Sequence, residues 1–134
     1  MARTSRSFAV MVLLAVVATG CQATAPSPSD EQPVLVAIPT AEPAAGQLAC
    51  MDALMTGVLV ADEEVGVAVE AADGSTMIVV WPHGWAAVDD DGARVVLNDR
   101  GDPVAQVGDE VAIGGGQGPD GRWHTCGEVT RGAP

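Results

Sequence analysis

Residues Val65–Trp81 read VGVAVEAADGSTMIVVW and predict two antiparallel strands joined by a tight turn. In the first half, valine alternates with small or charged residues, which is the period-two pattern of a half-buried strand. Asp73-Gly74 follows, a dipeptide that favours the positive φ angles of hairpin turns. The second half is β-branched and ends at Pro82. Its alternation places Trp81 on the same face as Val79, so we expect Trp81 in the core.

Similar short apolar runs flank this hairpin and are separated by Gly- and Asp-rich turns. They lie at Thr56–Ala61, Arg94–Leu97, Pro103–Val107, Glu110–Gly114 and Trp123–Thr130. Only Cys50–Met55 is expected to form a helical turn. About six short strands at near-regular spacing predict a mainly β fold. We expect a small, partly open β-barrel of the OB or SH3 type over residues 48–131.

Two cysteines, Cys50 and Cys126, stand at opposite ends of this predicted domain. A domain this small gains from a covalent link, and in an oxidising compartment the two residues would suit a disulfide. The alternative is a pair of buried free thiols. The third cysteine, Cys21, lies outside this domain and has a separate predicted role, described below. A bridge between Cys50 and Cys126 therefore leaves no cysteine as an odd free thiol.

Residues 21–47 carry five prolines among serine, threonine and alanine. Proline opposes helix and sheet pairing, and this composition cannot bury a core, so we expect a disordered tether. Within it, Val34–Ile38 is apolar enough to pair as an additional strand.

The first 20 residues have the layout of an export signal. Arg3 and Arg6 precede the apolar run Phe8–Ala18, which is too short to span a bilayer and fits the apolar region of a signal peptide. Ala18-Thr19-Gly20-Cys21 resembles the bacterial lipobox. That resemblance implies cleavage after Gly20, acylation of Cys21 and a lipid anchor on the extracytoplasmic face of the cell membrane. An ordinary secretory signal is the alternative.

The chain is strongly acidic, with a formal net charge of −12. All 18 carboxylates but only four of the six arginines lie after residue 20. Such a surface repels phosphate backbones and anionic headgroups, which argues against nucleic acid as a partner.

Four spaced motifs, WPHG from Trp81, NDRG from Asn98, VAQVGDEV from Val104 and the triple glycine from Gly114, form a series over Trp81–Gly116. The series resembles that of an uncharacterised group of bacterial, largely actinobacterial, lipoproteins and secreted proteins. Members of that group often carry proline and an aromatic residue where His83 and Trp85 stand here. The resemblance implies a compact β domain and brings no mechanism.

The patterns that could carry catalysis or metal binding are incomplete. No positioned nucleophile accompanies either histidine, so we predict no catalytic residue, no cofactor and no enzyme activity. Gly116–Gly121 matches G-x-G-x-x-G only as a string, because Pro119 and Asp120-Gly121 favour a turn. Asp89–Asp91 lacks carboxylates at the outer positions of a calcium loop and is expected to be a solvated turn.

His83 and Trp85 remain as candidate ligand-binding residues. Trp85 follows Gly84 outside the strand pattern, so we expect it to be exposed and free to stack on a sugar or peptide. The sequence thus predicts a lipid-anchored, non-enzymatic module that binds an envelope protein or glycan, or has a structural role there. The alternative is a small envelope metal-binding protein or hydrolase that uses His83, His124 and nearby carboxylates.

Overall fold

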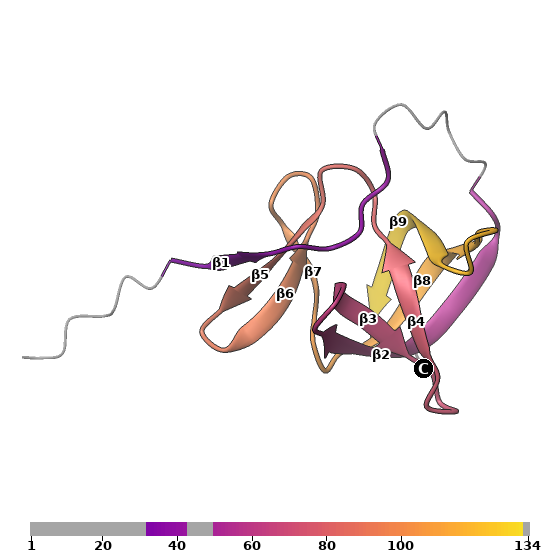
Figure 1. Ribbon diagram of the computed structural model, residues 1–134, viewed down its shortest axis with the longest axis horizontal. Helices are drawn as coiled ribbons and strands as arrows, with labels where there is room; N and C mark the ends of the chain where they lie inside the picture. Colours follow the sequence, from indigo (N-terminus) through magenta and orange to yellow (C-terminus); the bar gives the residue numbers. More distant parts are fainter. Residues whose placement is uncertain (1–31, 43–49, 133–134) are drawn as a thin grey trace, which may run out of the picture.

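The computed structural model describes residues 32–42 and 50–132. These residues form two β-sheets and no helix (Figure 1). The strands are β1 (Val34–Val36), β2 (Ala53–Asp62), β3 (Gly66–Glu70), β4 (Thr76–Val80), β5 (Ala86–Asp90), β6 (Ala93–Leu97), β7 (Pro103–Gln106), β8 (Glu110–Gln117) and β9 (Trp123–Arg131). In the described ranges no helix has the length and apolar character needed to cross a bilayer. The predicted signal peptide and Cys21 lie outside those ranges.

The larger sheet closes on itself in the order β2-β3-β4-β9-β8. The β4–β9 pair is parallel and the other four pairs are antiparallel. Strand β2 pairs with β8 along its first part and with β3 along its last part, and Val58 has a partner in both. A Cβ at Gly57 would collide with the backbone carbonyl of Glu70, so a glycine is needed where β2 changes partner. The sequence predicted a partly open sheet, whereas this sheet is closed.

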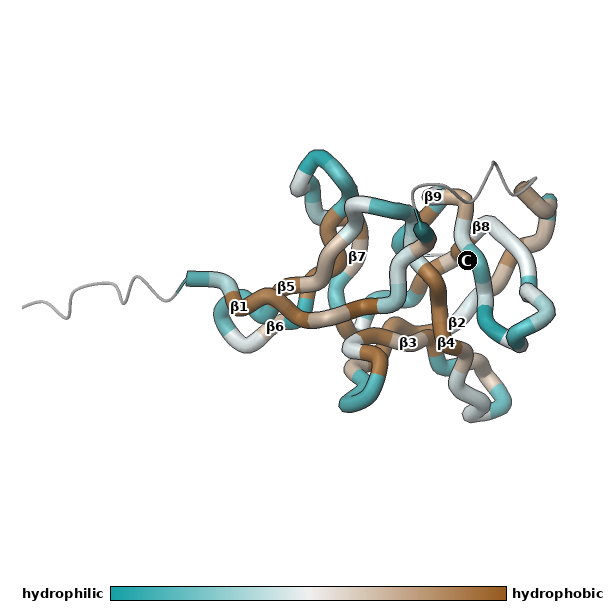
Figure 2. The backbone as a smooth tube through the Cα atoms, turned by 45° about the horizontal axis from the view of Figure 1, so that its top comes forward, coloured by the Kyte–Doolittle hydropathy of each residue, from teal (hydrophilic) through white to brown (hydrophobic). Residues whose placement is uncertain are grey.

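The predicted hairpin Val65–Trp81 is confirmed as β3 and β4. Ala68 faces Ile78 and Glu70 faces Thr76 across the pair, with Asp73 and Gly74 in the turn. Trp81 is fully buried, as its parity predicted, and Figure 2 shows the apolar character of β3 and β4. The core cluster contains Leu59, Val67, Val69, Val79, Trp81, Ala87, Val96, Ala105, Val111, Ile113 and Trp123. It therefore joins residues from both sheets.

The smaller sheet has the order β1-β5-β6-β7 (Figure 1). We predicted that residues 21–47 form a disordered tether, and this prediction was wrong for residues 32–42, which contain the strand β1. Val34–Val36 pairs antiparallel with β5, and Val36 and Ile38 pack against the core. The apolar run forms a strand despite the surrounding prolines, because its backbone pairs with the edge of β5 and two of its side chains are partly buried against the core.

Two further details of the sequence-based fold were wrong. Cys50–Met55 does not form a helical turn; β2 begins at Ala53 within it, because pairing with β8 outweighs the helix propensity of Ala, Leu and Met. Ala86–Asp90 was not expected to be a strand, yet β5 is held between β1 and β6. The predicted disulfide is present, with the Cα atoms of Cys50 and Cys126 5.7 Å apart.

Arg94 on β6 joins the two sheets. Its guanidinium donates two hydrogen bonds to the Asp89 carboxylate, at 2.7 Å and 2.9 Å, and a third at 2.8 Å to the backbone carbonyl of Gly66. The hydrogen bond from Arg94 holds the pKa of Asp89 below its usual range. Such a bidentate pair fixes geometry as well as charge.

The contribution of this pair to stability should depend on pH. Because the pKa of Asp89 is lower in the folded protein, its contribution is present above the unfolded value, about 3.9, and is lost as pH falls through the folded pKa. We expect Asp89→Asn to lower the urea midpoint at neutral pH and to approach the wild type as the pH falls through the folded pKa of Asp89.

The control for this measurement is Asp90→Asn, on the same strand, where the described structure records no ion pair. It should leave the neutral-pH midpoint nearly unchanged. A deficit in Asp89→Asn that persists unchanged at the acid end would contradict the role assigned to the ion pair.

Candidate functional site

The turn after β4 places the two predicted ligand-binding residues differently. His83 is exposed, and its side chain has no hydrogen bond or ion pair recorded within the described ranges. The N–H of Trp85 donates to the Pro82 carbonyl at 3.2 Å, which closes the turn. Gly84 lies at the tip with a φ of 83°, a conformation that glycine adopts without strain.

The expectation that Trp85 is exposed was wrong, because the side chain is half-buried. Its ring stacks on that of Trp81, with centroids 5.8 Å apart and planes at 19°. The reversal at Gly84 folds the chain back, so the second tryptophan lies against the first. A ligand could therefore reach only the part of Trp85 that stays open, and a binding role for His83 and Trp85 remains a prediction.

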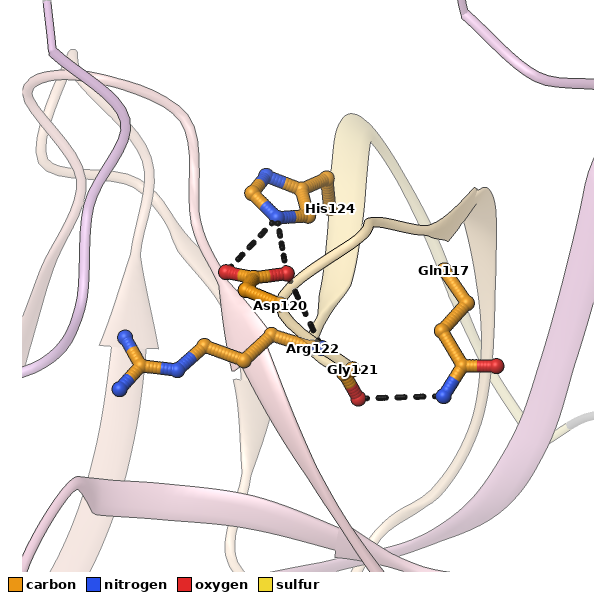
Figure 3. Close-up of polar contacts among 5 residues, drawn as sticks. All are labelled: Gln117, Asp120, Gly121, Arg122 and His124. Atoms are coloured by element: carbon orange, nitrogen blue, oxygen red, sulfur yellow. Dashed lines mark hydrogen bonds and ion pairs between the residues drawn. The ribbon is translucent and has the colours of Figure 1, made fainter.

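A second polar group lies at the turn between β8 and β9 (Figure 3). The Nε2 atom of His124 is 3.1 Å and 3.3 Å from the two carboxylate oxygens of Asp120. Asp120 also accepts a hydrogen bond from the Arg122 backbone N–H. The contact with His124 is the main cause that holds the pKa of Asp120 below its usual range.

The glycines of this turn have a packing role. A Cβ on Gly118 would lie 2.6 Å from His124 Nε2, so a side chain there would displace the imidazole from its present position. Gln117 Nε2 donates to the Gly121 carbonyl across the same turn at 3.1 Å (Figure 3). The G-x-G-x-x-G string thus begins at the end of β8 and continues into a hairpin turn, as its Pro and Asp-Gly predicted.

Two glycines of the triple glycine within β8 lie very close to neighbouring parts of the chain. A side chain on Gly116 would overlap Met51, and one on Gly115 would overlap the carbonyl of His124. The register between β8 and β9 shifts between Ile113 and Gly115. The glycines therefore let Met51, which precedes β2, and the strand β9 lie close against β8.

The possible metal sites do not assemble. Among the described side chains, no group of three or more His, Cys, Asp or Glu residues is placed to hold a metal ion. The acidic run Asp89–Asp91 forms the end of β5 and a tight turn, with Asp91 at φ 47° and Asp89 committed to Arg94. His124 and Asp120 form a pair without a third ligand, so the described residues offer no metal centre.

A separate depression lies beside β2, and neither histidine is among the residues that line it. Its lining includes Val58 and the acidic residues Glu70, Asp73 and Glu110. These carboxylates make it unsuited to an anion. The three carboxylates come from two strands, β3 and β8, and from one turn, so no local sequence pattern groups them.

No family model, no curated protein and no solved structure matches the chain.

Proposed function

We propose that the protein is an exported, lipid-anchored binding module of the bacterial cell envelope and has no catalytic activity. The observation that carries the proposal is the closed five-stranded sheet with one disulfide, in which the described residues include no group of three or more His, Cys, Asp or Glu placed to hold a metal ion. A domain built this way offers surfaces and loops for recognition.

The strand order supports a finer assignment of the larger sheet as an OB-type barrel. If its five strands are numbered in chain order, they follow one another around the ring as first, second, third, fifth and fourth. The third and fifth, which are β4 and β9, are parallel. This is the connectivity of the OB fold, and here β5, β6 and β7 are inserted between the third and fourth strands. OB folds bind ligands such as oligonucleotides and oligosaccharides.

The charge narrows the class of ligand. With 18 carboxylates against six arginines, the chain repels the phosphates that many OB folds bind. An envelope protein or an uncharged glycan fits this surface better than nucleic acid. The histidine-based metal or hydrolase alternative has no specific support, since the described residues give His124 one carboxylate partner and His83 none.

The disulfide supports export, because such bonds persist in oxidising compartments. The lipobox Ala18–Cys21 supplies the proposed anchor. A cysteine that carries two or more acyl chains holds a protein stably to a bilayer, which one chain does not.

Changing Cys21 tests the anchor directly. We expect Cys21→Ala to block processing, which leaves a larger precursor without incorporated fatty acid, as read by metabolic labelling and gel mobility. The control is Cys126→Ala, which should still be cleaved and labelled. A Cys21→Ala chain that is cleaved and still remains with the membrane would contradict lipidation at this residue.

A further inference from the structure

The segment Gln32–Glu42, called the strap from here on, contacts both sheets (Figure 1). Its strand β1 pairs antiparallel with β5, from Val34 opposite Asp89 to Val36 opposite Ala87. Farther on, Thr40 forms a parallel bridge with Trp81 at the end of β4. The strap therefore adds an edge strand to the smaller sheet and makes a single bridge to Trp81, the residue that follows β4.

The main chain supplies much of the contact. The Trp81 N–H donates to the Pro39 carbonyl at 2.9 Å, and the Ala41 N–H donates to the Trp81 carbonyl at 2.8 Å. At Gly66 a Cβ would collide with the Ala37 carbonyl, so the glycine lets the strap backbone approach closely. Contacts of this kind accept an extended chain regardless of most of its side chains.

Side chains give the contact its selectivity. Val36 and Ile38 are partly buried and pack against the core, whereas Leu35, the middle residue of β1, is 76% exposed. The inward positions are thus two residues apart, as in an extended strand, and Pro39 follows them. This is the pattern of strand addition, in which backbone bonds give affinity and alternate side chains give specificity.

The residues of the strap are more exposed to solvent than the residues that they contact. None of its eleven residues is fully buried, whereas Trp81, Ala87 and the glycine at position 66 beneath it are. Segments with few fully buried contacts open at a lower free energy than the core. An incoming strand could therefore replace the strap without dismantling the closed sheet.

The N-terminal end of the strap lies in an acidic environment. A depression beside Gln32 and Val34 is lined by Asp89 and Asp91. Asp89 is paired with Arg94, and the described structure shows no cation beside Asp91. The strap itself brings no positive charge, so a strand with a basic residue at the position of Gln32 would gain an attraction that the strap lacks.

We infer that the strap occupies a peptide-binding site, and that its partner is an extended apolar peptide with two β-branched anchors, a proline after them and a basic residue before them. This inference deepens the proposed binding function and rests on it for the binding role. It names strand addition next to β5 and Trp81 as the mode of recognition.

An exchange experiment on the full mature chain tests the inference. Residues 21–134 with Cys21→Ser are folded with a protease site inserted between Ala45 and Gly46, and then cleaved. Fluorescent peptides with the sequence of Gln32–Glu42 are added, and bound label is measured after gel filtration while circular dichroism follows the fold. The labelled peptide should replace the cleaved strap in a saturable way with the β signal retained.

Three peptide variants make the test specific. Ile38→Ser, which removes an inward anchor, should bind at least about tenfold more weakly. Leu35→Ser, the matched outward change, should stay within about twofold of the parent peptide. Gln32→Arg should bind a few-fold more tightly at low salt and lose this gain at high salt.

Each other outcome counts against the inference. A cleaved strap that never exchanges, or a fold lost when the strap leaves, would make the segment a permanent structural strand. Equal binding of the Ile38→Ser and Leu35→Ser peptides would contradict the anchor role of the inward side chains. If Gln32→Arg gives no gain in affinity, the preference for a basic residue is wrong. A strap-swapped dimer of the uncleaved chain would identify a second copy as the occupant. Lipidation of Cys21 does not enter this assay, so its failure and failure of the anchor are distinguishable.

Discussion

Replacing Trp81 with alanine is expected to lower the free energy of unfolding by about 3–5 kcal/mol, as the loss of a fully buried aromatic side chain does. Trp81 has no exposed surface and is the largest fully buried side chain of the core. It packs among residues of both sheets and carries Trp85 on its face. Its removal would open a cavity where the strap, the closed sheet and the smaller sheet meet. Chemical denaturation measures the loss.

Two further variants make this result interpretable. Trp85→Ala should cost less, about 1–3 kcal/mol, because the side chain is only half-buried. Trp81→Phe should also cost less than Trp81→Ala, because phenylalanine leaves a smaller cavity and the buried Nε1 of Trp81 has no hydrogen-bond partner whose loss would add to the cost. If Trp85→Ala proves the more destabilising tryptophan variant, the core assignment of Trp81 is wrong.

Breaking the Cys50–Cys126 bond is expected to produce a loss of similar size. The bond joins residues 76 positions apart, and the chain-entropy model gives about 4.5 kcal/mol as an upper value for a loop of this length. For a domain of this size, that corresponds to a fall in Tm of more than about 10 °C. Thermal denaturation with and without reductant, in a Cys21→Ser background, measures it.

Thiol labelling gives the matching control. Neither Cys50 nor Cys126 should react with a thiol probe in the unfolded, unreduced domain, and both should react after reduction. Full labelling before reduction would show that the bond does not form in the protein. An unchanged Tm after confirmed reduction would instead show that the bond contributes little to the fold.

Local sequence patterns predicted those parts of the fold that local interactions determine. The alternation in Val65–Trp81 and its Asp-Gly turn required only near neighbours, and both are present as β3, β4 and their turn. The elements that were missed depend on distant partners. Val34–Val36 becomes a strand only because β5 lies beside it, and β2 extends into Cys50–Met55 only because β8 pairs with it.

The candidate site divides in the same way. The turn at Gly116–Gly121 was predicted from its proline and Asp-Gly, but the contact between His124 and Asp120 was not predicted. Asp120 lies in the turn between β8 and β9, and the hairpin brings His124, four residues later, back over that turn; this spacing could have indicated the contact. The burial of Trp85 could not be foreseen, because it depends on how Gly84 returns the chain onto Trp81.

The central claim, an exported and lipid-anchored β domain closed by one disulfide, is tested most directly by mass spectrometry. The protein is extracted from native membranes, digested without reduction and examined for two peptides. The account predicts an N-terminal peptide that begins at acylated Cys21 and a second species in which Cys50 and Cys126 are linked. An N-terminal peptide that begins elsewhere, an unmodified Cys21, or free thiols at Cys50 and Cys126 would contradict it.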